Sequence, residues 1–411
     1  MPRISVSPGR PGDARVLRPA PCSSVTLVAL MRSSSLTTSL IAALVLSAPA
    51  LACVSSASRI EAYKSGAATT RATPALRRGI NFGDAMDAPN EGEWGWTIGA
   101  DDFRAVREAG FDHVRVPMRV SAHAARQPPY KIEGRFAHRM DWAVATALEN
   151  DLAVIVDVHH YKEMMADPFG QADRLVGIWR EIATRYRGMP PAVVYEILNE
   201  PTDQLTAPVW NPILARVVAE IRAIDPTRTI IVEGAHWASA RDLKETLEVP
   251  AGDPNIVASF HMYAPMYFTH QGFPWMPRQY GTTGVVFPGP PSAPLAPCAA
   301  AASFEESREF FARYNAEPAA TNPGGPAAIV EQLDLAKAYA DRTGMRVYLG
   351  EFGAGVNADL ASRARWTRVA RTEAERRGFG WGYWDYARNF AAYGKGVRNG
   401  WIKEMRGALV Q

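Results

Sequence analysis

Residues 193–201 read VVYEILNEP and residues 347–353 read VYLGEFG, so each of two short apolar runs leads to a glutamate. Runs of this length that are rich in β-branched and aromatic residues are typical of strands buried on both faces of a parallel sheet. A carboxylate at the end of such a strand lies at the edge where parallel α/β folds place their chemistry. Two of them predict the carboxylate pair that cleaves glycosidic bonds.

Strand-like and helix-like segments alternate from residue 78 onward. The expected strands are 79–82, 113–116, 153–158, 193–198, 229–232, 256–260, 347–350 and 380–384, and the expected helices are 101–109, 139–148, 174–187, 210–224, 241–247, 329–343 and 359–376. Eight such units predict an α/β fold, a (β/α)8 TIM barrel that forms a single catalytic domain. An open doubly wound sheet is the alternative, but no Gly-rich phosphate loop follows the first strand.

The connection after the sixth strand is too long for an ordinary βα unit. Its excess, Pro277–Pro326, is rich in Pro, Gly and Ala. Loops of this length are usually functional lids or disordered segments. We therefore expect an enlarged loop that overhangs the barrel mouth, where it either closes one end of a cleft or is a surface excursion without contact to substrate.

The N-terminal segment has the pattern of an export signal. The apolar run Leu36–Leu46 follows Arg32, and Ala50-Leu51-Ala52 supplies small residues for cleavage. Met31 directly precedes this pattern and is an alternative start to Met1. The expected organisation is a signal peptide with an upstream extension at 1–52, a flexible Ser/Ala/Thr-rich linker at 53–77 and the catalytic domain at 78–411.

Export also follows from this pattern, either by secretion or to a periplasm. Cys53 directly follows the small residues, which leaves lipoprotein processing open as the only expected route to a membrane. The three cysteines, Cys22, Cys53 and Cys298, provide neither a disulfide framework nor metal-ligand spacing. Five arginines and one aspartate give residues 1–52 a formal charge of +4, so the rest of the chain sums to −1 and predicts no nucleic-acid surface. We expect a monomer.

Polar and aromatic residues follow nearly every expected strand. They are Arg115, Asp157, His159, His160, Asn199, Glu200, His261, Tyr263, Glu351, Trp384 and Asp385. Breaking an acetal needs a proton donor and an ionised carboxylate beneath the oxocarbenium-like centre. Burial beside a second carboxylate would keep Glu200 protonated as the acid, and Arg115 with Tyr263 would keep Glu351 ionised.

The neighbours of this pair suggest supporting roles. Asn199 would hydrogen-bond a sugar hydroxyl, while His159 and His261 would orient carboxylates or hydroxyls. Flat faces for stacking sugar rings are available on Trp384, Trp275, Tyr267 and Tyr161. No cofactor and no metal are expected.

The order and wording of these motifs resemble glycoside hydrolase family 5, in particular its thermophilic bacterial endoglucanases with mixed glucan and mannan activity. The matching stretches are 79–83, 88–92, 114–117, 159–161, 196–201, 261–263, 268–272, 350–354 and 381–384. The resemblance implies retaining hydrolysis of β-1,4-linked glucan or mannan, with Glu200 as acid/base and Glu351 as nucleophile. It also implies a supporting shell of Arg115, His159, Asn199, His261, Tyr263 and Trp384, and a sugar cleft lined by His160, His270 and Trp275.

Asp84 and Asp87 stand where the similar enzymes have Asn and Glu. By the resemblance they face the non-reducing-side subsites, so the choice between glucose and mannose stays open. Three other functions also stay open. They are an exo-acting or oligosaccharide-specific β-glycosidase, a metal-dependent hydrolase using Asp157, His159, His160 and His261, and a glycan-binding protein without catalysis.

Overall fold

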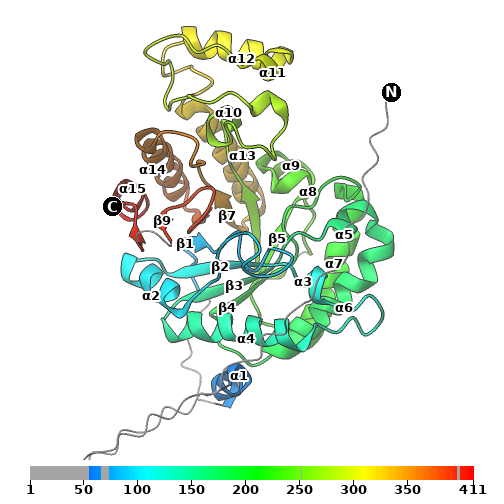
Figure 1. The fold of residues 1–411 in the computed structure, drawn as a ribbon. Coiled ribbons are helices and arrows are strands. Elements are labelled where there is room, and N and C mark those ends of the chain that lie inside the picture. Colours follow the sequence, from blue (N-terminus) through cyan, green and yellow to red (C-terminus); the bar gives the residue numbers. More distant parts are fainter. Residues whose placement is uncertain (1–54, 66–73, 251, 396–398) are drawn as a thin grey trace, which may run out of the picture. The chain divides into compact units, whose positions relative to one another are not determined.

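The computed structural model describes residues 55–65, 74–250, 252–395 and 399–411. Eight parallel strands close into a barrel in which β8 pairs back onto β1, so the predicted (β/α)8 fold is confirmed (Figure 1). The barrel strands are β1 (Arg78–Asn81), β2 (His113–Met118), β3 (Ala153–Val158), β4 (Val193–Glu196), β5 (Ile230–Glu233), β6 (Ile256–His261), β7 (Arg346–Phe352) and β8 (Gly380–Tyr383).

Helices connect these strands around the outside of the barrel (Figure 1). The long ones are α2 (Ala100–Ala109), α4 (Gly134–Glu149), α6 (Pro168–Tyr186), α7 (Ala207–Ile224), α13 (Pro326–Thr343) and α14 (Leu360–Arg376). Shorter ones are α3 (Val120–His123), α5 (Lys162–Ala166), α8 (Ala235–Ala238), α9 (Ala240–Glu245), α10 (Met266–Thr269), η1 (Arg278–Tyr280), α11 (Ala299–Ala302), α12 (Glu305–Ala316) and α15 (Lys403–Val410), and β9 (Tyr393–Gly394) pairs with β10 (Gly400–Trp401).

Helix ends follow local chemistry that the sequence shows. The side chain of Asp359 accepts a hydrogen bond from the backbone nitrogen of Ser362 and caps α14. Gly110 and Gly344 end α2 and α13 in the left-handed conformation, at φ 100° and 69°. Glycine is favoured there because it has no Cβ to clash.

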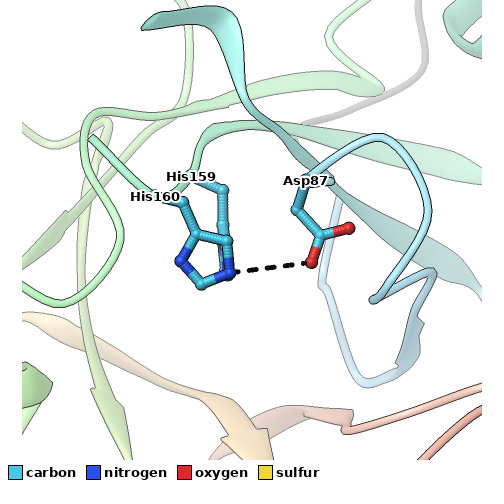
Figure 2. A group of neighbouring side chains, drawn as sticks. All are labelled: Asp87, His159 and His160. Carbon is cyan, nitrogen blue, oxygen red and sulfur yellow. Dashed lines mark ion pairs between the residues drawn. The ribbon is translucent and has the colours of Figure 1, made fainter. Parts of the chain in front are cut away.

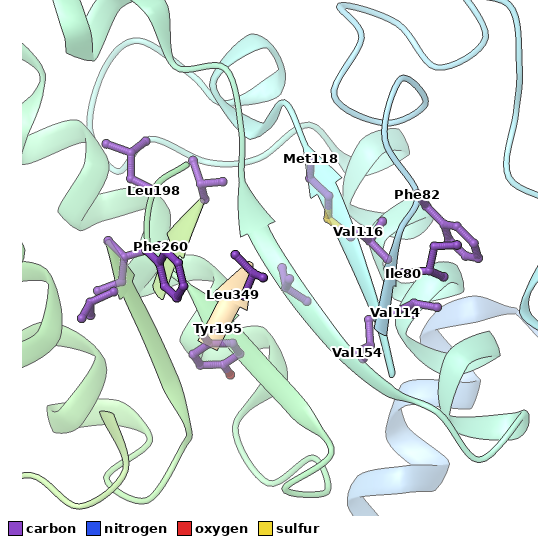
Figure 3. Close-up of a cluster of buried hydrophobic side chains, with 14 of the residues drawn as sticks. Ile80, Phe82, Val114, Val116, Met118, Val154, Tyr195, Leu198, Phe260 and Leu349 are labelled. Carbon is purple, nitrogen blue, oxygen red and sulfur yellow. The ribbon is translucent and has the colours of Figure 1, made fainter. Parts of the chain in front are cut away.

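Strand residues alternate between two cores. Ile80, Val114, Val116 and Val154 point outward and pack under the helices, as Figure 3 shows. Full burial of such a side chain stabilises the fold by roughly 1.5–3 kcal/mol. The opposite face lines the barrel interior, where a small apolar cluster fills one level: Leu76, Ala153, Ile155, Ala192, Val194, Ile231, Val257 and Tyr348. One or two steps further along the strands, the inward positions become charged.

The enlarged loop between β6 and β7 is ordered by its own small core. The Tyr314 hydroxyl accepts from the backbone nitrogen of Val286 at 2.9 Å, and the ring of Phe310 stacks on Tyr267 with centroids 4.1 Å apart. The backbone nitrogen of Phe287 donates to Ser362 at 3.0 Å, which ties the loop to α14. The loop is therefore a packed appendage.

The expected linker differs from the structure at 56–65, where α1 (Ser56–Ser65) is a helix on the outside of α4. Ile60 is 3% exposed, and Arg59 donates to Glu149 Oε1 at 2.7 Å and to Thr146 Oγ1 at 3.1 Å. These contacts with α4 stabilise a helix that is too short to be stable in isolation. The expected signal peptide and Cys53 lie outside the described residues. In the described ranges, no helix has the length and apolarity needed to cross a bilayer.

Candidate active site

A layer of polar side chains fills the end of the barrel interior toward which the strands run. It consists of Asn81, Arg115, Asp157, Glu196, Glu233, Ser259, His261 and Glu351, all of them buried. Asp157, Glu196, Glu233 and Ser259 each stand two residues beyond an apolar member of the interior cluster, so strand alternation brings them to the same side of the sheet. Contacts between non-neighbouring strands, such as Arg115 of β2 with Glu351 of β7, cross the interior and connect this layer.

Arg115 is the cation at the centre of the layer. Its guanidinium donates to both oxygens of Glu196 at 2.8 and 2.9 Å, to Glu351 Oε1 at 2.7 Å and to Asn199 Oδ1 at 2.8 Å. Asp157 Oδ2 lies 3.0 Å from Nη2. Burial opposes charge on Arg115, but the three carboxylates outweigh it and raise its pKa well above the ordinary value. The charge of Arg115 is therefore permanent.

Glu351 is held by donors on both of its oxygens. Arg115 engages Oε1, and the hydroxyl of Tyr263 donates to Oε2 at 2.7 Å. The two contacts leave the carboxylate 5% exposed and facing the cleft described below. This is the arrangement expected from the sequence for a carboxylate that must stay ionised.

Glu200 meets a different environment. Its Oε1 lies 2.8 Å from His261 Nδ1, and burial raises the pKa of its carboxyl, with a further upward contribution from the charge of Glu351. Oxygens of Glu200 and Glu351 lie within 4.8 Å of each other. Retaining glycosidases hold their two carboxyl groups about 5–5.5 Å apart, whereas inverting enzymes need roughly 6.5–9.5 Å. The spacing fits double displacement.

Glu233, at the end of β5, was not expected from the sequence as a site residue. Its Oε2 accepts from the backbone nitrogen of Glu200 at 2.7 Å, and its Oε1 forms an ion pair with His261 Nε2 at 2.8 Å. Burial alone would lower the pKa of His261, but the charges of Glu233 and Glu351 raise it well above the usual value. Glu233 therefore holds His261 as an imidazolium beside Glu200. The signal was present in the sequence as a glutamate closing the fifth strand.

Three residues just beyond strand ends have left-handed backbones. They are Asp84, His160 and Glu200, at φ 60°, 52° and 48°. In an extended chain successive side chains point to opposite faces. Left-handed residues after β3 and β4 let the pairs His159-His160 and Asn199-Glu200 both face one cleft. Backbone strain of this kind clusters at functional sites.

A cleft of about 850 Å³ lies over these carboxylates, and we call it the catalytic cleft. It brings together most of the residues expected from the sequence, namely Asp84, His159, His160, Asn199, Glu200, Tyr263, His270, Trp275, Glu351 and Trp384, with Glu93, Trp94, Gly95, Arg388, Asn389 and Phe390. Burial lowers the pKa of His159 well below its usual value and that of His160 to about 4, so both rings are neutral at pH 7.

Several expected positions differ in the structure. Asp87 does not line the cleft, because its carboxylate is buried and accepts from the backbone nitrogens of Asp84 and Ala85 at 3.0 and 2.7 Å. The expected stacking face of Tyr161 is buried, and that of Tyr267 packs inside the enlarged loop. The four ligands of the metal-dependent alternative do not converge as one set.

A second hollow also adjoins Glu200. It is lined by His160, Tyr161, Lys162, Met165, Asn199, Glu200, Thr202, Asp203 and Trp237. Trp237 stands 58% exposed on a left-handed backbone at φ 55°. The hollow shares His160, Asn199 and Glu200 with the catalytic cleft, so the two open spaces adjoin at these residues.

Comparisons with known proteins agree with this geometry. Residues 79–390 match the family model for cellulase, glycosyl hydrolase family 5. Endoglucanase H of Acetivibrio thermocellus is 29% identical over 307 residues, which are 75% of this chain and 29% of that longer protein. Structures of Thermotoga maritima Cel5A are also similar. The one with cellobiose is 36% identical with TM-score 0.70, covering 82% of this chain and 98% of that one. The one with mannotriose is 34% identical with TM-score 0.69, covering 86% and 100%.

Proposed function

This chain belongs to glycosyl hydrolase family 5, and we propose that it is a retaining, endo-acting hydrolase of β-1,4-linked glucan and mannan. The single observation that carries the proposal is the pairing of two unlike carboxylates across the cleft. Glu351 is bound by a cation and a hydroxyl donor, whereas Glu200 has a raised pKa. The donors around Glu351 suit a nucleophilic carboxylate, and the raised pKa of Glu200 suits a proton donor.

In the proposed reaction, Glu351 attacks the anomeric carbon as the bond to the leaving oxygen breaks. Glu200 transfers its proton to that oxygen, and a covalent glycosyl-enzyme forms. Glu200, now ionised, takes a proton from water, whose oxygen attacks the same carbon and releases Glu351. Arg115 and Tyr263 stabilise the carboxylate of Glu351 before attack and after release. Because each of the two steps inverts the configuration of the anomeric carbon, the product keeps the configuration of the substrate.

Endo action is supported by the shape of the site. The catalytic cleft and the second hollow both border Glu200, so an extended polymer has open space beyond the cleft itself. Among the described residues, no side chain of 277–326 lines either of them. The enlarged loop is thus better described as an excursion than as a closure of the cleft.

The proposal includes both glucan and mannan as substrates, because structures of Thermotoga maritima Cel5A have been determined with cellobiose and with mannotriose. Asp84 lines the cleft and accepts a hydrogen bond from Asn389 at 3.1 Å. Asp87 affects sugar binding indirectly, because its carboxylate holds the backbone of the loop that carries Asp84. We therefore propose that Asp84 contributes directly to the choice of sugar.

The test uses glutamine variants of the two carboxylates, a surface control variant and an azide rescue with an activated substrate. Glu200→Gln and Glu351→Gln should each nearly abolish hydrolysis of β-glucan and glucomannan, whereas Glu309→Gln, on the exposed surface of α12, should not. Glu351→Gly with azide and 2,4-dinitrophenyl β-cellobioside should yield an α-glycosyl azide. Absence of that product from a folded variant would contradict the assignment of Glu351 as nucleophile.

An exo-acting or oligosaccharide-specific enzyme is the second candidate, because a packed loop could still approach a bound polymer. Viscosity and product analysis on soluble β-glucan, glucomannan and galactomannan separate the two. A rapid fall in viscosity supports endo action. Release of short sugars without loss of viscosity would favour the second candidate.

Export and a monomeric state belong to the same proposal. They are supported by the apolar run Leu36–Leu46 with Ala50-Leu51-Ala52, and by the polymeric substrate, which is encountered outside the cell. Mass spectrometry of the mature N-terminus and of any lipid on Cys53 tests the processing, and light scattering tests the monomer.

A further inference from the structure

Asp87, His159 and His160 form a group of three metal-ligand side chains, in which the two histidines line the catalytic cleft and Asp87 is buried next to them. Figure 2 shows that they come from two different loops, Asp87 from the one after β1 and the histidines from the one after β3. One ligand atom of each lies within 4.8 Å of those of the other two. The catalytic steps above use none of the three as acid, base or nucleophile.

His159 has the orientation of a metal-binding histidine. Its Nδ1 lies 2.5 Å from Asp157 Oδ2, and Asp157 in turn is paired with Arg115. When a carboxylate accepts a hydrogen bond from Nδ1–H, the lone pair of Nε2 stays available for a metal ion, as in carboxylate–histidine–zinc triads. No hydrogen bond of the described residues engages that Nε2, although the side chain is almost fully buried and lines the cleft.

Asp87 and His160 complete the set with little movement. Oδ2 of Asp87 lies 3.9 Å from Nε2 of His160. Two ligands of one tetrahedral zinc lie roughly 3.3 Å apart, given bond lengths of about 2.0–2.1 Å. His160, whose side chain is 38% exposed, would have to move to close the difference, because Asp87 is held by two backbone donors.

The surrounding charge favours a cation. Asp84 and Asp385 are two further carboxylates close to Asp87, and the negative charges of neighbouring carboxylates repel one another. Oδ2 of Asp385 is buried without a hydrogen-bond partner. A bound cation would relieve this repulsion. Two imidazoles and one carboxylate select zinc-like ions over Ca²⁺ or Mg²⁺, which prefer oxygen ligands.

We propose that Asp87, His159 and His160 bind one divalent first-row transition ion, such as Zn²⁺, with water as the fourth ligand. The ion sits in the space that a sugar would fill and therefore inhibits hydrolysis competitively. The inhibition rests on the proposed function, whereas the binding itself does not.

Titration calorimetry of the full chain with Zn²⁺ tests the binding, using protein without a polyhistidine tag. We expect one ion per chain, with affinity reduced at least ~10-fold in His160→Gln and unchanged in His138→Gln, an exposed histidine on α4. Glu351→Gln should keep the affinity, which separates this site from the Glu200–His261–Glu351 group. Equal affinity in wild type and His160→Gln, or no binding in wild type, would overturn the proposal.

Co²⁺ provides a second readout that is independent of activity. Visible absorption bands of a tetrahedral ion should appear in wild type and Glu351→Gln and be absent in His160→Gln, with melting curves to show that each variant is folded. Inhibition by Zn²⁺ should raise KM for cellotetraose and leave kcat unchanged. A lowered kcat with unchanged KM would contradict a site in the cleft. Zn²⁺ binding by a protein that cleaves no glycan would instead reject the proposed function alone.

Discussion

Replacing Glu233 by glutamine tests whether this buried residue positions the catalytic acid. Glutamine has the same size, but only one of its two terminal atoms is an acceptor, so it cannot present an oxygen to both the Glu200 nitrogen and His261. If it keeps the bond from the Glu200 nitrogen, its amide group faces His261 Nε2, which must then be deprotonated. Glu200 thereby loses the imidazolium on its Oε1.

The magnitude follows from the contact that is lost. A hydrogen bond to a charged group contributes about 1.5–3 kcal/mol. If that amount is lost from the alignment of the acid, kcat/KM for cellotetraose falls roughly 10- to 150-fold, at 1.36 kcal/mol per tenfold. Because the charge of His261 lowers the pKa of Glu200, its loss should also move the basic limb of the pH profile to higher pH.

The assay compares two leaving groups. A sugar oxygen must be protonated to leave, whereas 2,4-dinitrophenolate leaves without a proton, so 2,4-dinitrophenyl β-cellobioside should be affected far less in its first step. Glu220→Gln, an exposed partner of Arg180, is the matched control and should change neither rate. An equal loss on both substrates by a variant with unchanged melting temperature would refute the positioning role. Glu233→Asp keeps the negative charge, so the basic limb of its pH profile should stay at the wild-type position.

Three further outcomes follow from burial and charge. Asp385→Asn should raise the melting temperature by about 2–4 °C at pH 8 and by less at pH 5. Burial raises the pKa of Asp385, so this carboxyl binds a proton more tightly in the folded state than in the unfolded state. The stability of the wild type therefore falls as pH rises above about 4. An advantage that does not grow with pH would contradict this. Arg115→Met leaves Glu196 and Glu351 without their cation and should cost about 3–5 kcal/mol of unfolding free energy in urea; unchanged stability would mean that the network is dispensable. Ile60→Ala should increase proteolysis within α1 while hydrolysis stays the same, and resistance equal to wild type would show that docking does not depend on this side chain.

Local sequence patterns determined the barrel and the place in it of the two glutamates proposed as the catalytic pair. All eight expected strands are present within a few residues of their expected bounds, because β-branched apolar runs have few alternatives to a doubly buried strand. A glutamate that follows such a run must lie at the strand end, so Glu200 and Glu351 could be placed on one rim without coordinates. Asp359, Gly110 and Gly344 marked helix ends by equally local chemistry.

Tertiary structure decided which neighbours meet across the barrel. The pairing of Glu233 with His261 and Glu200, and that of Glu196 with Arg115, joins residues far apart in sequence. No local pattern encodes such contacts, since they depend on strand order and on the inward face of each strand. The burial of Asp87 likewise follows from the turn after β1 and not from its side-chain type.

The same limit explains α1 and the enlarged loop. The Ser- and Ala-rich stretch 56–65 has little apolar pattern of its own, and its helix is stabilised by docking Ile60 and Arg59 onto α4. The Pro- and Gly-rich loop is ordered by Tyr314 and by its bond to α14. Sequence alone determines structure where the free energy comes from neighbours along the chain. Where the stabilising free energy comes from packing onto a surface that exists only after the barrel has closed, as for α1 and the enlarged loop, the structure of the segment depends on the tertiary fold.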